Sequence, residues 1–183
     1  MKCYSIKQAF GHGLDSERLI LKPFALAHIT TDYIDWLNNS EVVKYSNQRF
    51  KHHTWVTCVD YLNGFEATGN LFINIEKKED GLCVGTMTAY VSEFHQTVDV
   101  GIMIGRLSVW RVGIGYEAWS LLLSWLLEQE SVSKVTAGTM RCNIPMIKIF
   151  ERSGMRLEAV RPNQELLNGE PQDILYYGKF KNS

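Results

Sequence analysis

The residues most suited to chemistry lie around two glycines, Gly113 and Gly115, which stand directly before an apolar helical pattern ending near Leu127. Glycine lets a backbone turn tightly and approach a ligand closely. The first turn of a helix offers free N–H groups and a partial positive charge. With the charge of Arg111 beside them, these features predict an anion site, most often for phosphate. The alternative is a strand-to-helix turn that needs glycine for geometry alone.

The flanking segments must position this loop. Residues 97–104 alternate as a half-buried strand, which places Asp99 on the face opposite Val98 and Val100. A second strand is predicted over residues 134–139. A helix follows, with Asn143 as its N-cap and a glycine as its stop. The predicted order is therefore strand, glycine loop, helix, strand, helix.

This order resembles the GNAT superfamily of acetyl-CoA-dependent N-acetyltransferases. The match is closest to the branch that contains ribosomal-protein N-terminal, spermidine and nucleotide-amino-sugar acetyltransferases. Residues 110–115 fill the pyrophosphate frame Q/R-x-x-G-x-G/A, with Trp110 where Gln or Arg usually stands. Residues 143–155 and 16–23 are similar to further segments of the branch, as is Asn168-Gly169 followed by Asp173. The resemblance covers nearly all of residues 16–180.

The resemblance implies acetyl-CoA as the acetyl-donor cosubstrate and no metal. The strand end would pair with the pantetheine arm, the glycine loop would hold the pyrophosphate, and the second helix would supply further contacts. The cofactor-binding residues implied are Ile102, Met103, Ile104, Arg111, Val112, Gly113, Ile114, Gly115, Tyr116, Asn143, Phe150 and Arg152.

For catalysis, the resemblance places Asp99 where the branch often has a Glu that serves as general base. A base is needed because an unperturbed ammonium has a pKa near 10. Many relatives have Tyr where this chain has Phe150, which has no proton to give, so the general acid stays open. Cys142 and Tyr116 are nearby in sequence, but neither has a pattern that favours this role.

The acceptor amine also stays open. Residues 45–53 lie where relatives build the substrate wall, and Tyr45, Arg49 and His53 are the candidates for acceptor binding. Arg with aromatic residues would suit an acceptor carrying phosphate, such as a nucleotide-linked amino sugar. Glu41 and Asp99 would instead suit a cationic peptide or a polyamine. Protein N-termini and small antibiotics also fit, and a solvated loop is the alternative for the whole segment.

Composition bounds the class of protein. The chain has 183 residues, a net charge of −1, and 45% hydrophobic and 21% charged residues, as expected for one ordinary globular domain. Bulk charge gives no reason to expect nucleic acid or an anionic membrane as a partner. The four cysteines lack metal-type spacing, and neither a signal peptide nor a membrane span is evident. We therefore expect a cytoplasmic protein, as a monomer or a homodimer.

The remaining segments predict an α/β (α+β) fold, a single GNAT-like domain over residues 16–183. Its twisted, mostly antiparallel mixed sheet would carry helices on both faces. Residues 1–15 show no periodicity and are expected to form a loose arm. Helices are predicted over residues 25–38 and from the cap at Thr54 to a stop at Gly64, with closing strands over 156–160 and 174–180.

Three functions compete at this point. The first is an N-acetyltransferase that transfers acetyl to a primary amine by direct attack in a ternary complex, with Asp99 as base. The second is a non-catalytic sensor or partner module that binds acetyl-CoA, and Phe150 in place of Tyr keeps it in view. The third is another kind of nucleotide-binding domain. It is disfavoured because no acidic residue closes a dinucleotide βαβ unit in the expected form.

Overall fold

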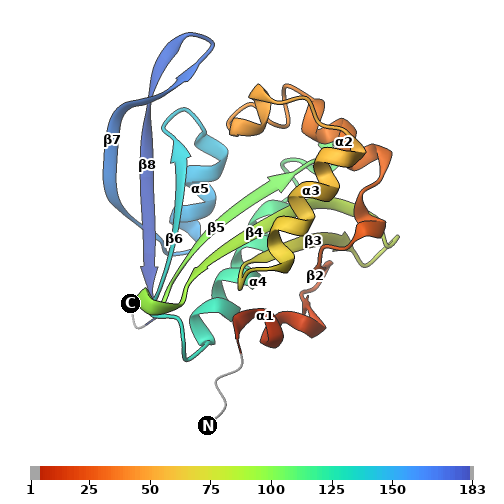
Figure 1. Cartoon of the computed structure of the whole chain (residues 1–183). Coiled ribbons are helices and arrows are strands. Elements are labelled where there is room, and N and C mark those ends of the chain that lie inside the picture. Colours follow the sequence, from red (N-terminus) through yellow and green to blue (C-terminus); the bar gives the residue numbers. More distant parts are fainter. Residues whose placement is uncertain (1–4, 182–183) are drawn as a thin grey trace.

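An eight-stranded sheet forms the centre of the molecule in the computed structural model, which describes residues 5–181 (Figure 1). The strand order is β1-β2-β3-β4-β5-β6-β8-β7, and every neighbouring pair is antiparallel except β5 and β6. The strands are β1 Leu14–Asp15, β2 Leu19–Pro23, β3 Leu71–Lys77, β4 Cys83–Ser92, β5 Thr97–Ile104, β6 Lys134–Met140, β7 Arg156–Leu167 and β8 Glu170–Phe180. This is the mixed, mostly antiparallel sheet that the sequence predicts.

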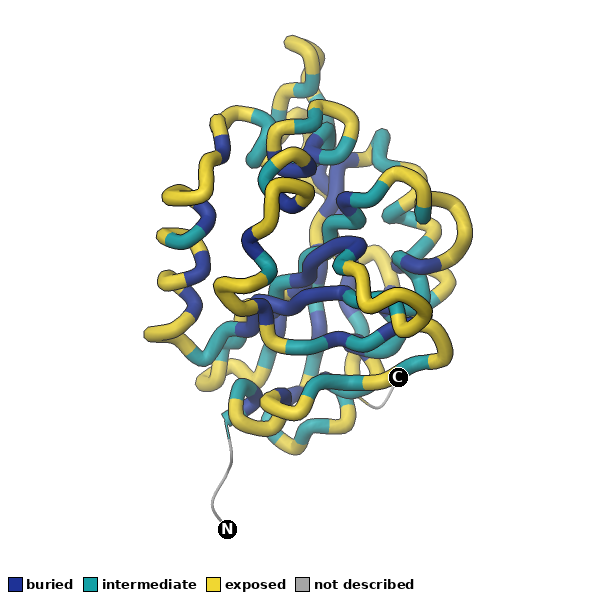
Figure 2. The backbone as a smooth tube through the Cα atoms, turned by 90° about the vertical axis from the view of Figure 1, so that its right-hand side faces the viewer, coloured by how far each residue is buried: buried dark blue, intermediate teal, exposed yellow. Residues whose placement is uncertain are grey.

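Helices cover both faces of the sheet. α1 (Ile6–Ala9), α4 (Ile114–Glu128) and α5 (Ile144–Arg152) pack on the face that holds the larger hydrophobic core. The apolar stripe of α4 enters that core, where Trp119 and Leu122 are almost fully buried. In Figure 2 the buried residues concentrate in the strands at the middle of the molecule and on one side of the helices. Alternate side chains of the strands and one face of α4 therefore pack together in the larger core, as the sequence patterns predict.

The second face is covered only in part. α2 (Thr31–Asn38) and α3 (Trp55–Glu66) enclose a smaller aromatic core with β3, which includes Phe65 and Phe72. In Figure 1 these helices lie beside β3, β4 and β5, whereas β6, β8 and β7 carry no helix on that side. Most of β7 is exposed. The part of this face formed by β6, β8 and β7 is therefore open (Figure 1).

Several local predictions are confirmed by backbone geometry. The Asn143 side chain accepts a hydrogen bond from the Met146 N–H and caps α5, which ends before Gly154 at φ +79°. Asn168 and Gly169 turn the β7–β8 hairpin with φ values of +53° and +84°. Both lie in the left-handed region that a two-residue hairpin turn requires.

Other boundaries differ from the prediction. The helix expected over 25–38 is split into the short 3₁₀ helix η2 (Leu26–His28) and α2, because Thr30 caps a new helix by accepting from the Tyr33 N–H. Thr54 does cap α3, but Gly64 lies inside that helix, which continues to Glu66. The closing strands are also longer than expected, since strand pairing carries β7 and β8 through polar segments.

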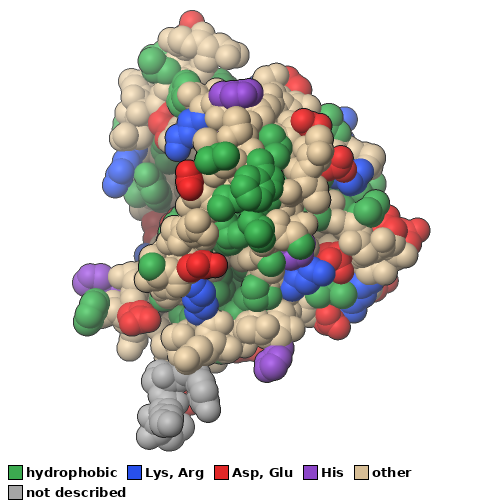
Figure 3. All heavy atoms as spheres, turned by 45° about the vertical axis from the view of Figure 1, so that its right-hand side comes forward, with side chains coloured by type: hydrophobic (Ala, Val, Ile, Leu, Met, Phe, Trp, Pro, Cys, Tyr) green, Lys and Arg blue, Asp and Glu red, His purple; other side chains and the backbone are tan. Residues whose placement is uncertain are grey.

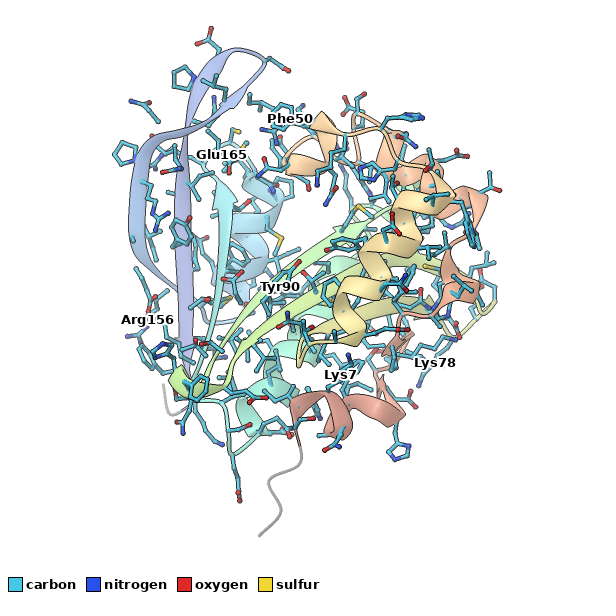
Figure 4. All side chains as sticks on the ribbon, viewed as in Figure 1. Lys7, Phe50, Lys78, Tyr90, Arg156 and Glu165 are labelled. Carbon is cyan, nitrogen blue, oxygen red and sulfur yellow. The ribbon has the colours of Figure 1, made fainter. Side chains whose placement is uncertain are left out.

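Residues 5–15 are ordered rather than a loose arm. They form α1, the 3₁₀ helix η1 (Phe10–His12) and β1, and the side chains of Ile6 and Phe10 are buried in the larger core. The Lys7 Nζ atom, labelled in Figure 4, donates to the carbonyl oxygens of Phe65 and Thr68 at the end of α3. Residues 1–4 of the expected arm, which include Cys3, lie outside the described residues.

Candidate active site

The site begins where the two parallel strands separate. β5 and β6 pair only from Thr97 to Asp99 and from Lys134 to Thr136. Beyond this point β5 stays with β4, and β6 stays with β8. The peptide groups of β5 from Gly101 onward therefore have an edge with no neighbouring strand. An extended ligand can add to such an edge through main-chain hydrogen bonds.

The glycine loop lies between the far end of this open edge and α4. The 3₁₀ helix η5 (Leu107–Val109) leads into it, and Arg111 and Gly113 both take left-handed backbone conformations, at φ +64° and +88°. Gly113 is the N-cap of α4, so the N–H groups of the first helical turn have no acceptor inside the helix. Left-handed residues ahead of a helix N-terminus can turn neighbouring N–H donors toward one side, an arrangement that suits an anion.

Two side chains fix the loop in place. The indole Nε1 of Trp110 donates to the Ile104 carbonyl oxygen at 2.8 Å, and Arg18 Nη1 donates to the Val112 carbonyl oxygen at 3.0 Å. Trp110 thus ties the loop to the open edge of β5. This contact gives a physical role to the aromatic residue that stands where relatives carry Gln or Arg.

An acidic residue lies close to this anion site, but its negative charge is balanced by Arg18. Glu117, in the first turn of α4, accepts from the Ser16 hydroxyl at 2.7 Å and from the Arg18 N–H at 2.9 Å, and Arg18 Nε lies 2.6 Å from its other oxygen. Burial disfavours the charged carboxylate, but these hydrogen bonds outweigh it and hold the pKa of Glu117 below its usual value. Glu117 therefore stays ionised and locked to Arg18.

Arg152 lies next to the same loop. Its guanidinium stacks on the Tyr116 ring at 4.0 Å from the centroid, and a hollow of about 580 Å³ lies beside both residues, with Arg18 and Gly113 in its lining. A hollow of this size is within the range of ligand sites. Two guanidinium groups and a helix N-terminus therefore line one recess.

Asn143 and Phe150 occupy different environments. Asn143 Nδ2 donates to Thr139 Oγ1 at 3.0 Å while its oxygen caps α5, so both ends of the amide are engaged. The Phe150 ring is 1% exposed and packs between Trp119 and Tyr177, with centroids 5.2 and 5.0 Å away. Phe150 is therefore a core residue. The sequence predicts it as a cofactor-binding residue, but its side chain is buried in the structure.

Asp99 lies at the point of separation. Its Oδ2 accepts a hydrogen bond from Thr136 Oγ1 at 2.7 Å, and Val98 and Val100 are buried on the other face, as predicted. Although Asp99 is exposed, neighbouring strands displace enough water to raise its pKa, and the hydrogen bond from Thr136 only partly opposes this. The pairing register places Tyr90 of β4 directly beside Asp99.

The three residues expected to bind the acceptor are found in and next to one short 3₁₀ helix, and two of them make polar contacts within the protein. Arg49, in the 3₁₀ helix η3 (Asn47–Phe50), donates to the carbonyl oxygens of Ser46 at 2.8 Å and Leu166 at 3.0 Å. His53 is 8% exposed, and its Nε2 lies 3.3 Å from the Gln48 carbonyl oxygen. Tyr45 is half-buried, with Lys44 5.7 Å from its ring centroid.

The contact between Arg49 and Leu166 joins η3 to the β7–β8 hairpin. Leu166 belongs to the tip of the β7–β8 hairpin, and Glu165 Oε2 lies 3.8 Å from Arg49 Nη2. In Figure 4 the labels Phe50 and Glu165 mark the two sides, and Tyr90 lies below them near the sheet. The sequence does not predict this contact, nor the position of Tyr90 beside Asp99, because both depend on contacts between distant parts of the chain.

The described part of the chain shows neither a metal cluster nor a membrane span. No group of three His, Cys, Asp or Glu side chains in residues 5–181 is arranged to hold a metal ion. Cys58, Cys83 and Cys142 are free thiols, and Cys58 is buried. No helix within those residues is long and apolar enough to cross a membrane.

The family follows from a comparison with known proteins. A family model described as an acetyltransferase (GNAT) domain matches residues 18–156, so the chain belongs to the GNAT acetyltransferase family and is an acyltransferase. No curated protein matches the sequence significantly.

Solved structures show the same fold at low identity. A GNAT-family acetyltransferase from Bacillus anthracis is 18% identical with a TM-score of 0.78, covering 93% of this chain and 99% of its own. RimL, a ribosomal L7/L12 α-N-protein acetyltransferase in complex with coenzyme A, is 13% identical with a TM-score of 0.80, covering 90% and 95%. MccE, the microcin C7 self-immunity acetyltransferase in complex with acetyl-CoA and AMP, is 17% identical with a TM-score of 0.78, covering 90% and 93%.

Proposed function

We propose that this acetyltransferase takes its acetyl group from acetyl-CoA and transfers it to a primary amine by direct attack in a ternary complex. The observation that carries the proposal is the separation of β5 and β6 beyond Asp99 and Thr136. It leaves a continuous path from the glycine loop, along an unpaired strand edge, to a carboxylate. A long thioester donor and an amine acceptor would meet at the end of that path.

The chain offers a group for each part of the donor. The first-turn N–H groups of α4 and the Arg152 guanidinium would hold phosphates. The open edge from Gly101 to Ile104 would pair with the pantetheine arm and polarise the thioester carbonyl. Asn143, which follows β6, would contact the same arm through the second N–H of its side-chain amide, since the first donates to Thr139. Acetyl-CoA itself would supply the activated acyl group.

Asp99 is proposed as the general base. Its carboxylate would take one proton from the ammonium, directly or through water, so that the free nitrogen lone pair can form the C–N bond as the C–S bond breaks. The second proton leaves the nitrogen and ends on the departing thiolate through solvent. This route needs no protein acid, which agrees with the burial of Phe150.

Calorimetric titration with acetyl-CoA tests the proposal. The wild type should bind in the micromolar range, and Gly113→Glu should abolish binding because it puts bulk and negative charge at the anion site. Gly81→Glu is the matched control: Gly81 has φ +69° and open space around it, but lies in the β3–β4 turn. Absence of binding by folded wild type would refute the proposed donor.

A further inference from the structure

A second cavity adjoins the proposed reaction centre. It has a volume of about 240 Å³ and lies between α2, α3 and the strands β3 to β5, next to the start of the open edge. Its lining residues are Tyr33, Leu37, Ser46, Gln48, Tyr61, Phe72, Thr86, Met87, Thr88, Tyr90, Gly101, Ile102 and Met103. None of these lining residues carries a charge, so the cavity favours a neutral group.

Aromatic rings form much of the wall. Tyr33 and Phe72 are deep, at 3% and 7% exposure, whereas Tyr61 and Tyr90 stand at the mouth with 37% and 44% of their surface exposed. The Tyr61 ring meets the Phe72 ring edge-on, with centroids 5.3 Å apart. Such rings offer both faces and edges to an inserted aromatic group.

The mouth is also held in a fixed shape. The hydroxyl oxygens of Tyr61 and Tyr90 are hydrogen-bonded at 3.1 Å, which links α3 to β4. One of the two hydroxyls donates to the other, and the second keeps its O–H free to donate to a polar atom of the ligand. A preformed cavity of this kind binds with little cost in side-chain ordering. Figure 3 shows hydrophobic side chains gathered on the face that carries α3.

The cavity and Asp99 are in register with each other. Tyr90 is paired with Asp99, and Thr88 is paired with Gly101, two residues further along the same two strands. A Cβ atom on Gly101 would lie only 2.9 Å from Thr88 Oγ1, so the passage between Asp99 and the cavity depends on the missing side chain. An amine held by Asp99 would therefore direct its substituent toward the rings.

Size and charge argue against the other acceptor classes. The volume lies below the range of about 300–1,000 Å³ that whole drug-sized ligands occupy, so it suits one side-chain-sized group rather than a nucleotide. The guanidinium expected to suit a phosphate, that of Arg49, is bonded to Ser46 and Leu166. A polyamine would find no carboxylate among the lining residues for its distal ammonium.

We propose that the acceptor is an arylalkyl amine, a primary amine whose aromatic ring is two or three bonds away and enters this uncharged cavity. The inference rests on the proposed function and adds the substrate class. The same chemistry occurs in a free arylalkyl amine and in a peptide with an N-terminal aromatic residue. The two differ in whether the carbon that bears the amine also carries a peptide chain.

A panel of acceptors at one acetyl-CoA concentration tests the inference, with kcat/KM measured by thiol release. The probes are 2-phenylethylamine, a Phe-Ala dipeptide, an Ala-Ala dipeptide, spermidine and glucosamine 6-phosphate. We expect 2-phenylethylamine or Phe-Ala to exceed the last three by about tenfold or more. Faster reaction of 2-phenylethylamine would indicate a free arylalkyl amine as the acceptor, and faster reaction of Phe-Ala would indicate a peptide N-terminus. Faster turnover of spermidine, Ala-Ala or the sugar phosphate would overturn the inference while leaving the acetyltransferase proposal intact.

The failures of the two proposals are distinguishable. Loss of the proposed function would appear as no acetyl-CoA binding by calorimetry. Binding without any turnover of either arylalkyl probe would overturn the inference alone. The two readouts therefore separate the donor from the acceptor.

Variants of α3 locate the effect in the cavity. Tyr61→Ala should lower kcat/KM for the preferred arylalkyl probe about tenfold, because it removes one wall, with acetyl-CoA affinity unchanged. Tyr61→Phe keeps the ring and should retain the preference. Trp55→Ala is the matched control, since Trp55 is an exposed aromatic residue on the same helix and is not part of the lining. Equal losses in Tyr61→Ala and Trp55→Ala would contradict the assignment.

Discussion

The hydroxyl of Thr136 donates to the Asp99 carboxylate across 2.7 Å at the last paired position of the two parallel strands. One hydrogen bond thus joins the strands at the point from which they diverge. It also holds the carboxylate at the base of the opening between them. The proposed base is consequently positioned by the same feature that creates the space for a donor.

Replacing Asp99 with Asn should lower kcat about 100-fold, within the usual contribution of a general base, with acetyl-CoA affinity unchanged. The Asn oxygen can still accept from Thr136, so the geometry is retained. Wild-type kcat should rise as pH passes through the raised pKa of Asp99. The Asp99→Asn variant should lack that limb in a pH–rate profile, and an unchanged profile would remove Asp99 from the role.

The same pKa shift has a consequence for stability. A carboxyl whose folded-state pKa is raised binds protons more tightly in the folded state, so its ionised form disfavours folding at neutral pH. Asp99→Asn should therefore melt at the same temperature as wild type or higher at pH 7, and any difference should vanish below the unfolded-state pKa.

Thr136→Val removes a hydrogen bond that favours ionisation of Asp99, so it should shift the acid limb of the pH profile of kcat to higher pH.

Arg152→Met should weaken acetyl-CoA binding about tenfold, since a charge-assisted contact to a phosphate would be lost while the stacking on Tyr116 is largely kept. Calorimetry at low and high salt gives the measurement, and the difference should shrink as salt rises. Arg156→Met is the control, because this exposed arginine begins β7, away from the loop (Figure 4). Similar losses in both variants would argue against a phosphate at Arg152.

Phe150→Tyr should not raise kcat. The added hydroxyl would enter the core between Trp119 and Tyr177, where an unsatisfied polar group costs about 1–3 kcal/mol. We expect a lower melting temperature together with an unchanged or reduced kcat. A gain in kcat with a new basic limb in the pH profile would show that this position does reach the leaving thiolate.

Glu117→Gln should destabilise the protein in a pH-dependent way. The pKa of Glu117 is lowered in the folded state, so its ionised form contributes stability above the unfolded-state value, near 4.3, and that contribution is lost as pH falls through the folded-state pKa. Thermal melts from pH 3 to 8 should show a wide gap to wild type at neutral pH that narrows as the pH falls below the unfolded-state value. Glu79→Gln, at a carboxylate whose side chain is 80% exposed, should show little gap at any pH.

The parts of the site that the sequence predicts are those encoded by local backbone chemistry. Gly113, Asn143 and the pair Asn168-Gly169 are found where their conformational preferences place them. Asp99 is on the predicted face, because strand alternation alone decides it. These positions need no knowledge of what lies across the sheet.

The parts that the sequence does not predict depend on distant contacts. Arg49 has the sequence context of a free cation, but its partner Leu166 is 117 positions away. Ile6 and Phe10 show no periodicity in so short a segment, yet they are buried by α4 and the sheet. The cavity below Tyr90 is made from α2, α3 and three strands, and no single stretch of sequence contains its pattern.

The Arg49 contact to the hairpin tip has a consequence for the mobility of the hairpin. Its guanidinium links η3 to Leu166 and Glu165 through a hydrogen bond and an ion pair. A long, exposed two-stranded hairpin would otherwise bend freely, and this tether restrains its tip.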